Sequence, residues 1–358
     1  MSSTLIFPGG MPESLRQLHV LKEKGAAVLG ASALTNDPAR PFYEQWEFLP
    51  YVTDAQFEPA LLALLAAHRV TTIFTRHPVI AIYLEQIIAK NKLAIALDKA
   101  PFAGATIHEQ QLTFARVDEV LESPFTLDFS GCAPALNRLQ MAALMQFTLA
   151  IEGQSSDEKI IAMIEMFRSC PQGDLIEIGS FWGRSASVLA LLAKHYAIGN
   201  LLCMDPWRND EAHQVGVADQ VNVETRNIDF ERAFLGFQLN LLPASHGHIN
   251  YIRGDAHVAH RDYQPGFTVT SDAFGTTRYT GRIACLHIDG NHALEPVSND
   301  IADWVPHVVP GGWIIIDDYQ WAFGDGPQIA ADRWMAANHA RVACAFVTGS
   351  ALFIKLVG

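Results

Sequence analysis

The sequence predicts an α/β protein of two domains, each with strands and helices in alternation. Three observations carry this prediction. The chain has 358 residues, about twice the length of a common domain. Short apolar runs alternate with segments of helical periodicity, as in parallel sheets flanked by helices. The alternation ends near residue 100 and starts again at Asp157, so two separate sheets are expected.

The first domain is expected over residues 1–105. Its strands and helices are predicted in the order Thr4–Phe7, Pro12–Lys24, Ala26–Gly30, 54–68, Thr71–Thr75, Pro78–Lys90 and Leu93–Leu97. β-branched and apolar runs favour the strands, and apolar residues three to four positions apart favour the helices. This order is that of a small Rossmann-like domain. Neither GxGxxG nor GxxxxGK[ST] occurs in it, so the domain carries no nucleotide-binding signature.

The second domain is expected over residues 156–358, after a helical connector at 106–155. The connector is predicted to hold one apolar helix, Ala135–Ile151, and the second domain begins with helices at Asp157–Arg168 and Arg184–His195. Seven strands are predicted, at Leu175–Ile178, Asn200–Met204, Ile249–Arg253, Ile283–Ile288, Trp313–Ile316, Val342–Val347 and Leu352–Leu356. The short Thr-Gly-Ser-Ala connection makes the last pair an expected antiparallel hairpin. The long segments 207–248 and 263–279 are expected to be loops, the first of them a lid.

Composition excludes several classes of protein. A net charge of −13, from 25 basic and 38 acidic residues, argues against binding to nucleic acid or to an anionic membrane. The 5 cysteines form no CxxC pair, so neither a disulfide framework nor a zinc ribbon is expected. This use of cysteine leads us to expect a cytoplasmic location. No apolar run reaches about 18 residues, and the first residues lack the pattern of a signal peptide.

The first candidate site is a glycine-containing turn between a strand and a helix. Gly179 permits a tight turn, and Gly183 lets the start of the helix approach a ligand. Ser180 and Ser185 lie beside the free N–H groups of that helix terminus, which suit a carboxylate or a phosphate. Glu177, at the end of the strand, could bond a ribose or an amino group. A tight turn without a ligand remains the structural alternative.

Two further acids follow the next strands. Asp205 comes directly after an apolar run, in the place where such folds bind ribose hydroxyls, although a helix-capping role is the alternative. Asp255 and Ala256 follow the strand after that, at the edge where an adenine would lie. Together with Glu177, these residues favour a nucleoside ligand.

Three carboxylates follow two more strands. Asp289 and His292 come after Ile283–Ile288, and Asp317 and Asp318 after Trp313–Ile316. Because ligands bind at the carboxyl ends of parallel strands, these side chains are expected to converge. Converging carboxylates repel one another unless a cation lies between them, and oxygen ligands favour Mg²⁺ or a similar divalent ion. The alternative is one functional aspartate with helix-capping neighbours.

In the order of its motifs, the second domain resembles the class I S-adenosylmethionine-dependent methyltransferases. The resemblance covers about residues 150–358 and is nearest to the metal-dependent macrolide-sugar O-methyltransferases and the cephalosporin-hydroxylase-associated proteins. Its motifs are Glu177 to Ser185, Asp205-Pro-Trp207, Gly254-Asp255-Ala256, Asp289-Gly-Asn-His292, Pro310-Gly-Gly312 and Asp317-Asp318. The chain departs from the common pattern at Phe181, where many methyltransferases have glycine, and at Asp317, where the related enzymes commonly have glutamate.

The resemblance implies a seven-stranded methyltransferase sheet, S-adenosylmethionine as cofactor and a divalent ion on Asp289, Asp317 and Asp318. It also implies that His292 is the general base, a task that suits a neutral imidazole near pH 7. We therefore expect a Mg²⁺-dependent O-methyltransferase acting on a hydroxyl of a small molecule, either a sugar or a natural product. No nucleic-acid or membrane partner is expected, and self-association is left open.

Two other readings are kept for comparison. A non-catalytic S-adenosylmethionine-binding or scaffold protein could keep the fold, although a decayed site need not keep three carboxylates and a histidine. A nicotinamide-dependent oxidoreductase is disfavoured because the dinucleotide fingerprint GxGxxG is missing.

Overall fold

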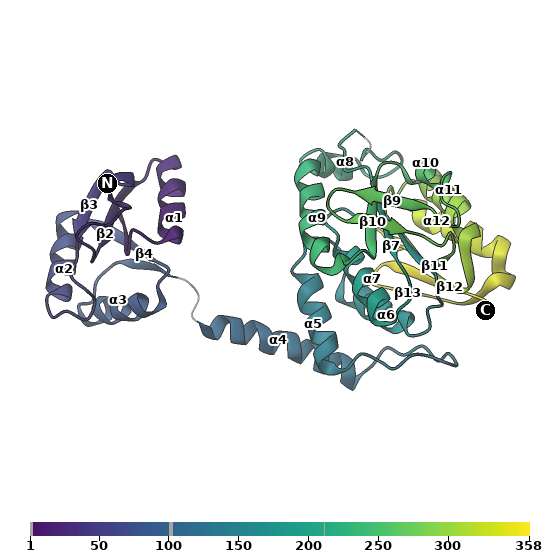
Figure 1. Cartoon of the computed structure of the whole chain (residues 1–358), viewed down its shortest axis with the longest axis horizontal. Helices are drawn as coiled ribbons and strands as arrows, with labels where there is room; N and C mark the ends of the chain where they lie inside the picture. Colours follow the sequence, from purple (N-terminus) through teal and green to yellow (C-terminus); the bar gives the residue numbers. More distant parts are fainter. Residues whose placement is uncertain (1–2, 100–102, 211) are drawn as a thin grey trace. The chain divides into compact units, whose positions relative to one another are not determined.

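The computed structural model describes residues 3–99, 103–210 and 212–358. The chain divides into two compact units, residues 1–111 and 112–358, and each is described by itself (Figure 1). The domain limits expected from the sequence, at 105 and 155, stay predictions. No helix in the described part of the chain is long and apolar enough to cross a membrane.

The first unit is a parallel five-stranded sheet with the order β3-β2-β1-β4-β5. Its strands are β1 (Ser3–Ile6), β2 (Ala27–Ser32), β3 (Gln45–Phe48), β4 (Val70–Thr75) and β5 (Ala96–Lys99). Its helices are α1 (Pro12–Glu23), α2 (Phe57–Ala67) and α3 (Pro78–Lys90). The alternation predicted from the sequence is found. Strand β3 was not predicted, because a mostly exposed edge strand carries no apolar run.

The second unit holds a seven-stranded sheet with the order β13-β14-β12-β11-β6-β7-β8. Its strands are β6 (Asp174–Ile178), β7 (Leu201–Asp205), β8 (Ile249–Arg253), β11 (Ile283–Ile288), β12 (Val308–Ile316), β13 (Val342–Thr348) and β14 (Ala351–Leu356). Strand β14 pairs antiparallel with β12 and β13, and the other pairs are parallel. The predicted fold class is confirmed, including the terminal hairpin.

Helices cover both faces of this sheet and form two apolar cores against it. They are α5 (Arg138–Leu149), α6 (Asp157–Phe167), α7 (Arg184–His195), α9 (Phe230–Ser245), α10 (Ala256–His260), α11 (Leu294–Trp304) and α12 (Gly326–Asn338). The short helix α8 (Asp219–Thr225) lies in the segment after β7 and contributes no residue to either core. Helix α5 begins at a capping box, in which Asn137 and Gln140 bond each other's main-chain N–H groups. Buried Met141 and Met145 of this helix join the core beside α7.

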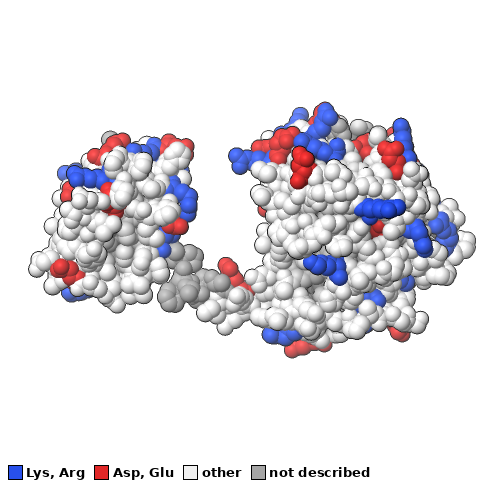
Figure 2. Space-filling view, viewed as in Figure 1, with Lys and Arg blue, Asp and Glu red and all other residues white. Residues whose placement is uncertain are grey.

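Two segments described here differ from the sequence prediction. Helix α4 (Ala103–Glu122) occupies part of the connector where no helix was expected. The segment 263–279 contains the antiparallel pair β9 (Thr268–Ser271) and β10 (Gly275–Arg278) instead of a plain loop. These strands are polar on both faces, so alternation of apolar residues could not reveal them. On the face seen in Figure 2, basic and acidic side chains are interspersed over each unit.

Candidate functional site

A cavity of about 900 Å³ lies at the carboxyl ends of the central strands of the second unit. Because β6, β7, β8, β11 and β12 are parallel, the turns that follow them meet at this edge. Most of the residues singled out from the sequence line the cavity: Gly179, Ser180, Gly183, Ser185, Asp205, Asp255, Ala256, Asp289, His292, Asp317 and Asp318. Glu177 is the exception.

The turn between β6 and α7 depends on its two glycines. Gly179 has a φ of +84°, and a Cβ atom there would lie 2.0 Å from the main-chain oxygen of Asp289. Gly183 has a φ of +89°, and its Cβ would lie 2.5 Å from a methyl carbon of Leu241. Only glycine therefore lets this turn approach both the β11 turn and helix α9. The buried hydroxyl of Ser180 has no hydrogen-bond partner in the part of the chain described, which leaves it for a ligand.

Asp205 holds this turn rather than facing solvent. Its Oδ2 accepts a hydrogen bond from the N–H of Phe181 at 2.9 Å, and its Oδ1 accepts one from the N–H of Trp207 at 2.6 Å. Both donors have left-handed backbone, with φ values of +45° and +44°. The carboxylate thus stabilises a non-glycine residue at position 181, where the resemblance leads one to expect glycine. Burial raises the pKa of Asp205 to about 6.

Asp255 has two roles in the structure. It caps α10, because its Oδ1 accepts a hydrogen bond from the N–H of His257 at 2.7 Å. It also lines the cavity, next to the buried Ala256 and close to Asp300 of α11. Asp300 was not singled out from the sequence, since an acid inside a helix reads as solvent-exposed. Burial and the charges of Asp255 and Asp303 raise the pKa of Asp300 to about 7.

Glu177 does not line the cavity. Its expected contact with a ribose or an amino group is therefore not supported by the structure. Its side chain is fully buried within β6, and its Oε1 lies 3.1 Å from Nδ1 of His287 on the neighbouring strand β11. The side chains of successive strand residues point to opposite faces, and this register aims Glu177 at His287 below the cavity floor.

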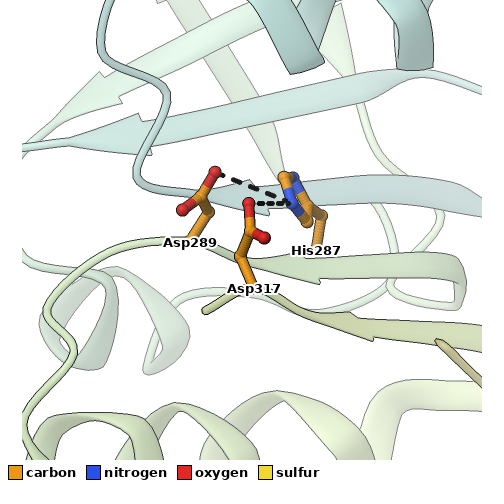
Figure 3. Close-up of side chains that lie close together, drawn as sticks. All are labelled: His287, Asp289 and Asp317. Carbon is orange, nitrogen blue, oxygen red and sulfur yellow. Dashed lines mark ion pairs between the residues drawn. The ribbon is translucent and has the colours of Figure 1, made fainter. Parts of the chain in front are cut away.

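The three predicted metal ligands do not form one cluster. Among the described residues, His287, Asp289 and Asp317 bring donor atoms within 4.8 Å of one another, and so do Asp289, His292 and Asp318. The first set is the inner group (Figure 3), in which Nε2 of His287 lies 3.8 Å from Oδ2 of both aspartates. The second set is the outer group, which faces the cavity. Asp289 belongs to both.

Lys159 of α6 contacts the inner group and was missed in the sequence. Its ammonium forms an ion pair with Oδ2 of Asp317 and lies 3.5 Å from Oδ2 of Asp289. The side chain is only 1% exposed. Burial lowers the pKa of Lys159, but the charges of Asp317 and Asp289 outweigh it and leave the pKa above its ordinary value. One feature of the sequence could have revealed Lys159: it lies on the apolar face of the predicted helix, one turn before Met163, which is buried.

His292 is the histidine of the outer group. Its Nε2 lies 3.1 Å from Oδ2 of Asp318 and 3.8 Å from Oδ1 of Asp289. Burial lowers the pKa of His292, whereas Asp289 and Asp318 raise it, and the net pKa lies above the ordinary value. The ring packs edge-on against Trp321, with centroids 4.8 Å apart. Its main-chain N–H donates to Oε1 of Gln214 at 3.1 Å.

The segment after β7 forms one wall of the cavity beside this histidine. Gln214, Glu224 and Phe230 line it together with Trp321 and Phe323. The segment was expected to be a loop, but it contains helices α8 and α9. The hydrogen bond from His292 to Gln214 ties this wall to the outer group.

Comparison with known proteins identifies part of the second unit. Residues 176–319 match a family described as a methyltransferase domain. This match confirms the methyltransferase that the sequence predicts. It spans the turns after β6, β7, β8, β11 and β12 that form the cavity. No curated protein matches the chain.

Several solved structures are similar to the chain at low sequence identity. The O-methyltransferase NovP is 15% identical, with a TM-score of 0.39, and the match covers 70% of this chain and 98% of NovP. The calicheamicin methyltransferase CalS11 is 14% identical, with a TM-score of 0.40 and coverage of 69% and 92%. An O-methyltransferase from Bacillus cereus in complex with SAH is 13% identical, with a TM-score of 0.35 and coverage of 70% and 100%.

Proposed function

We propose that this chain, whose residues 176–319 form a methyltransferase domain, is an S-adenosylmethionine-dependent O-methyltransferase acting on a small molecule. The observation that carries the proposal is a cavity that joins a glycine turn and strand-end acids to a partly buried histidine, His292, between two carboxylates. The first part suits a nucleoside cofactor, and the second suits removal of a proton from a hydroxyl.

The cofactor is assigned to the side of the cavity formed by the turns after β6, β7 and β8. Gly179 and Gly183 give close approach to the main chain, and Ser180 offers a free hydroxyl. Asp205 and Asp255 place carboxylates where ribose and adenine bind in folds of this class. Acids outnumber basic residues around the cavity, and S-adenosylmethionine supplies an electrophilic methyl group on a positively charged sulfur.

The transfer is assigned to His292. The acceptor hydroxyl gives its proton to the imidazole as its oxygen forms a bond to the methyl carbon. The bond between that carbon and sulfur breaks, and its electron pair stays on sulfur as a neutral thioether. Asp289 and Asp318 stabilise the imidazolium that forms, because their carboxylates lie 3.8 and 3.1 Å from Nε2. Holding both reactants in one cavity supplies much of the remaining rate.

Mg²⁺ on Asp289, Asp317 and Asp318 does not fit the arrangement of these side chains. Asp317 is in contact with the ammonium of Lys159, and Asp318 is paired with His292. A divalent ion shared by the three carboxylates would lie beside a buried positive charge, which repels it. No step of the mechanism is therefore assigned to a metal.

The acceptor is expected to be neutral or positively charged. Its side of the cavity offers aromatic surface from Trp321 and Phe323, hydrogen-bonding groups from Gln214 and a carboxylate from Glu224. Among the described lining residues, Arg184 is the one Lys or Arg, and its guanidinium bonds the main-chain oxygens of Ile151 and Ser155. A phosphate on the acceptor would thus find no free Lys or Arg among these lining residues, whereas a sugar or a phenol needs none.

Titration calorimetry with S-adenosylmethionine and its demethylated product tests the proposal. We expect one bound molecule per chain. Asp205→Ala should weaken binding by about 1–3 kcal/mol, because the carboxylate organises the turn that holds the cofactor. Asp272→Ala, in the exposed turn between β9 and β10, is the matched control and should bind like the wild type.

Absence of cofactor binding by the wild-type chain would contradict the proposal. A chain that binds S-adenosylmethionine but releases no demethylated product with any of a set of neutral sugars and catechols would favour the non-catalytic alternative.

A further inference from the structure

The inner group already contains a cation. Lys159 reaches it from α6, a helix that precedes the methyltransferase-domain match and lies 158 residues before Asp317 in the sequence. Its ammonium touches Oδ2 of Asp317 and lies 3.5 Å from Oδ2 of Asp289. Those two oxygens also face Nε2 of His287 at 3.8 Å each. One buried positive charge therefore sits at the point where the two carboxylates converge.

We propose that the ammonium group of Lys159 is the fixed cation of this site and takes the place between Asp289 and Asp317 that the sequence assigns to a divalent ion. The inference rests on the proposed function, because that function makes this cluster part of a methyl-transfer site. The contacts of Lys159 with the two carboxylates do not depend on that function. Lys159 is a positioning residue, since it lies behind the carboxylates and does not line the cavity. It balances their charge and fixes Asp289 so that Oδ1 faces His292.

Two further observations support this assignment. The ammonium is held by buried contacts rather than by water, because the side chain is 1% exposed and helix α6 packs in the core of the second unit. No other Lys or Arg among the described residues is in ion-pair contact with Asp289 or Asp317. Removing Lys159 would thus leave the two convergent carboxylates with the imidazole of His287 but no ammonium group, and carboxylates with a histidine are ligands that divalent ions bind.

Mn²⁺ binding followed by electron paramagnetic resonance tests the proposal, with full-length protein freed of metal by chelator. We expect the wild type to show no Mn²⁺ site that depends on Asp317. Lys159→Met removes the charge while keeping most of the length of the side chain, and should bind Mn²⁺ at least tenfold more tightly than the wild type. Lys159→Arg keeps the charge and is the matched control, so it should show no such gain. Adding Asp317→Asn to Lys159→Met should abolish the gain.

A Mn²⁺ site in the wild type that Asp317→Asn removes would overturn the proposal. A folded Lys159→Met protein without increased Mn²⁺ affinity would overturn it as well. If Lys159→Met does not fold, the comparison of the wild type with Asp317→Asn still decides. Calorimetry of the demethylated cofactor on the same wild-type preparation is the separate readout. Its failure would contradict the proposed function and leave the Mn²⁺ result standing.

Discussion

Gly179 and Asp289 are in main-chain contact across the cavity floor: a Cβ atom on Gly179 would lie 2.0 Å from the carbonyl oxygen of Asp289. The two residues belong to the turns after β6 and β11, which are neighbouring parallel strands. The turn assigned to the cofactor and the turn that carries His292 are thus fixed to one another by backbone packing.

This contact predicts that Gly179→Ala is strongly destabilising. The substitution adds the cost of a left-handed alanine to a clash with backbone, about 3 kcal/mol in total. Gly247→Ala is the matched control, because Gly247 has a φ of +79° and nothing within 4 Å of its Cβ position. It should cost only about 1 kcal/mol. Urea unfolding of both variants measures the difference, and equal losses would show that the contact with Asp289 is not tight.

His292→Ala should lower kcat by about 10²–10⁴-fold and leave cofactor affinity nearly unchanged, as for loss of a general base. A base must be neutral to accept a proton, so activity should fall as the pH drops through the raised pKa of His292. Asp318→Asn removes a charge that raises this pKa and should move the acidic limb of the kcat profile to lower pH. The exposed His213 provides the control His213→Ala. A His292→Ala enzyme with wild-type kcat would remove the assigned role.

Asp300→Asn should stabilise the protein at pH 8. The pKa of Asp300 is raised to about 7 from 3.8, so the folded state binds a proton that the unfolded state releases between about pH 4 and 7. Stability contributed by this group is therefore present at low pH and is lost as the pH rises through that window. The gain from the substitution should be about 2–4 kcal/mol at pH 8 and should nearly vanish at pH 4. Thermal unfolding at both pH values measures it, with a substitution of the exposed Asp128, Asp128→Asn, as the control variant.

Gln214→Ala should lower turnover about tenfold while cofactor binding is kept. Oε1 of Gln214 accepts a hydrogen bond from the main-chain N–H of His292 at 3.1 Å. This bond links the cavity wall to the base and helps to hold the base in position. Gln172→Ala is a suitable control, because Gln172 also makes one side-chain bond to the main chain, to Ala197 at 2.7 Å, but lies before β6. Calorimetry and release of the demethylated product separate binding from turnover. An unchanged kcat would show that the wall does not position His292.

The sequence by itself determined the order of most strands and helices in both units and brought most of its candidate site residues to one cavity. Apolar runs and helical periodicity are local properties, and a parallel sheet must bring the carboxyl ends of its strands to one edge. The turns at Gly179, Asp205, Asp255, Asp289 and Asp317 could therefore be placed together before any side-chain position was known.

Only the tertiary structure decided which of these side chains face the cavity and what neutralises their charge. Glu177 turns away from the cavity because the register of β6 and β11 pairs it with His287. Lys159 is 130 residues from Asp289, yet helix packing brings its ammonium to within 3.5 Å of that carboxylate. Local sequence signals carry no information about such a contact, since it depends on how a distant helix packs against the sheet. The sequence therefore indicates that a cation is required, and the fold provides it from the chain itself.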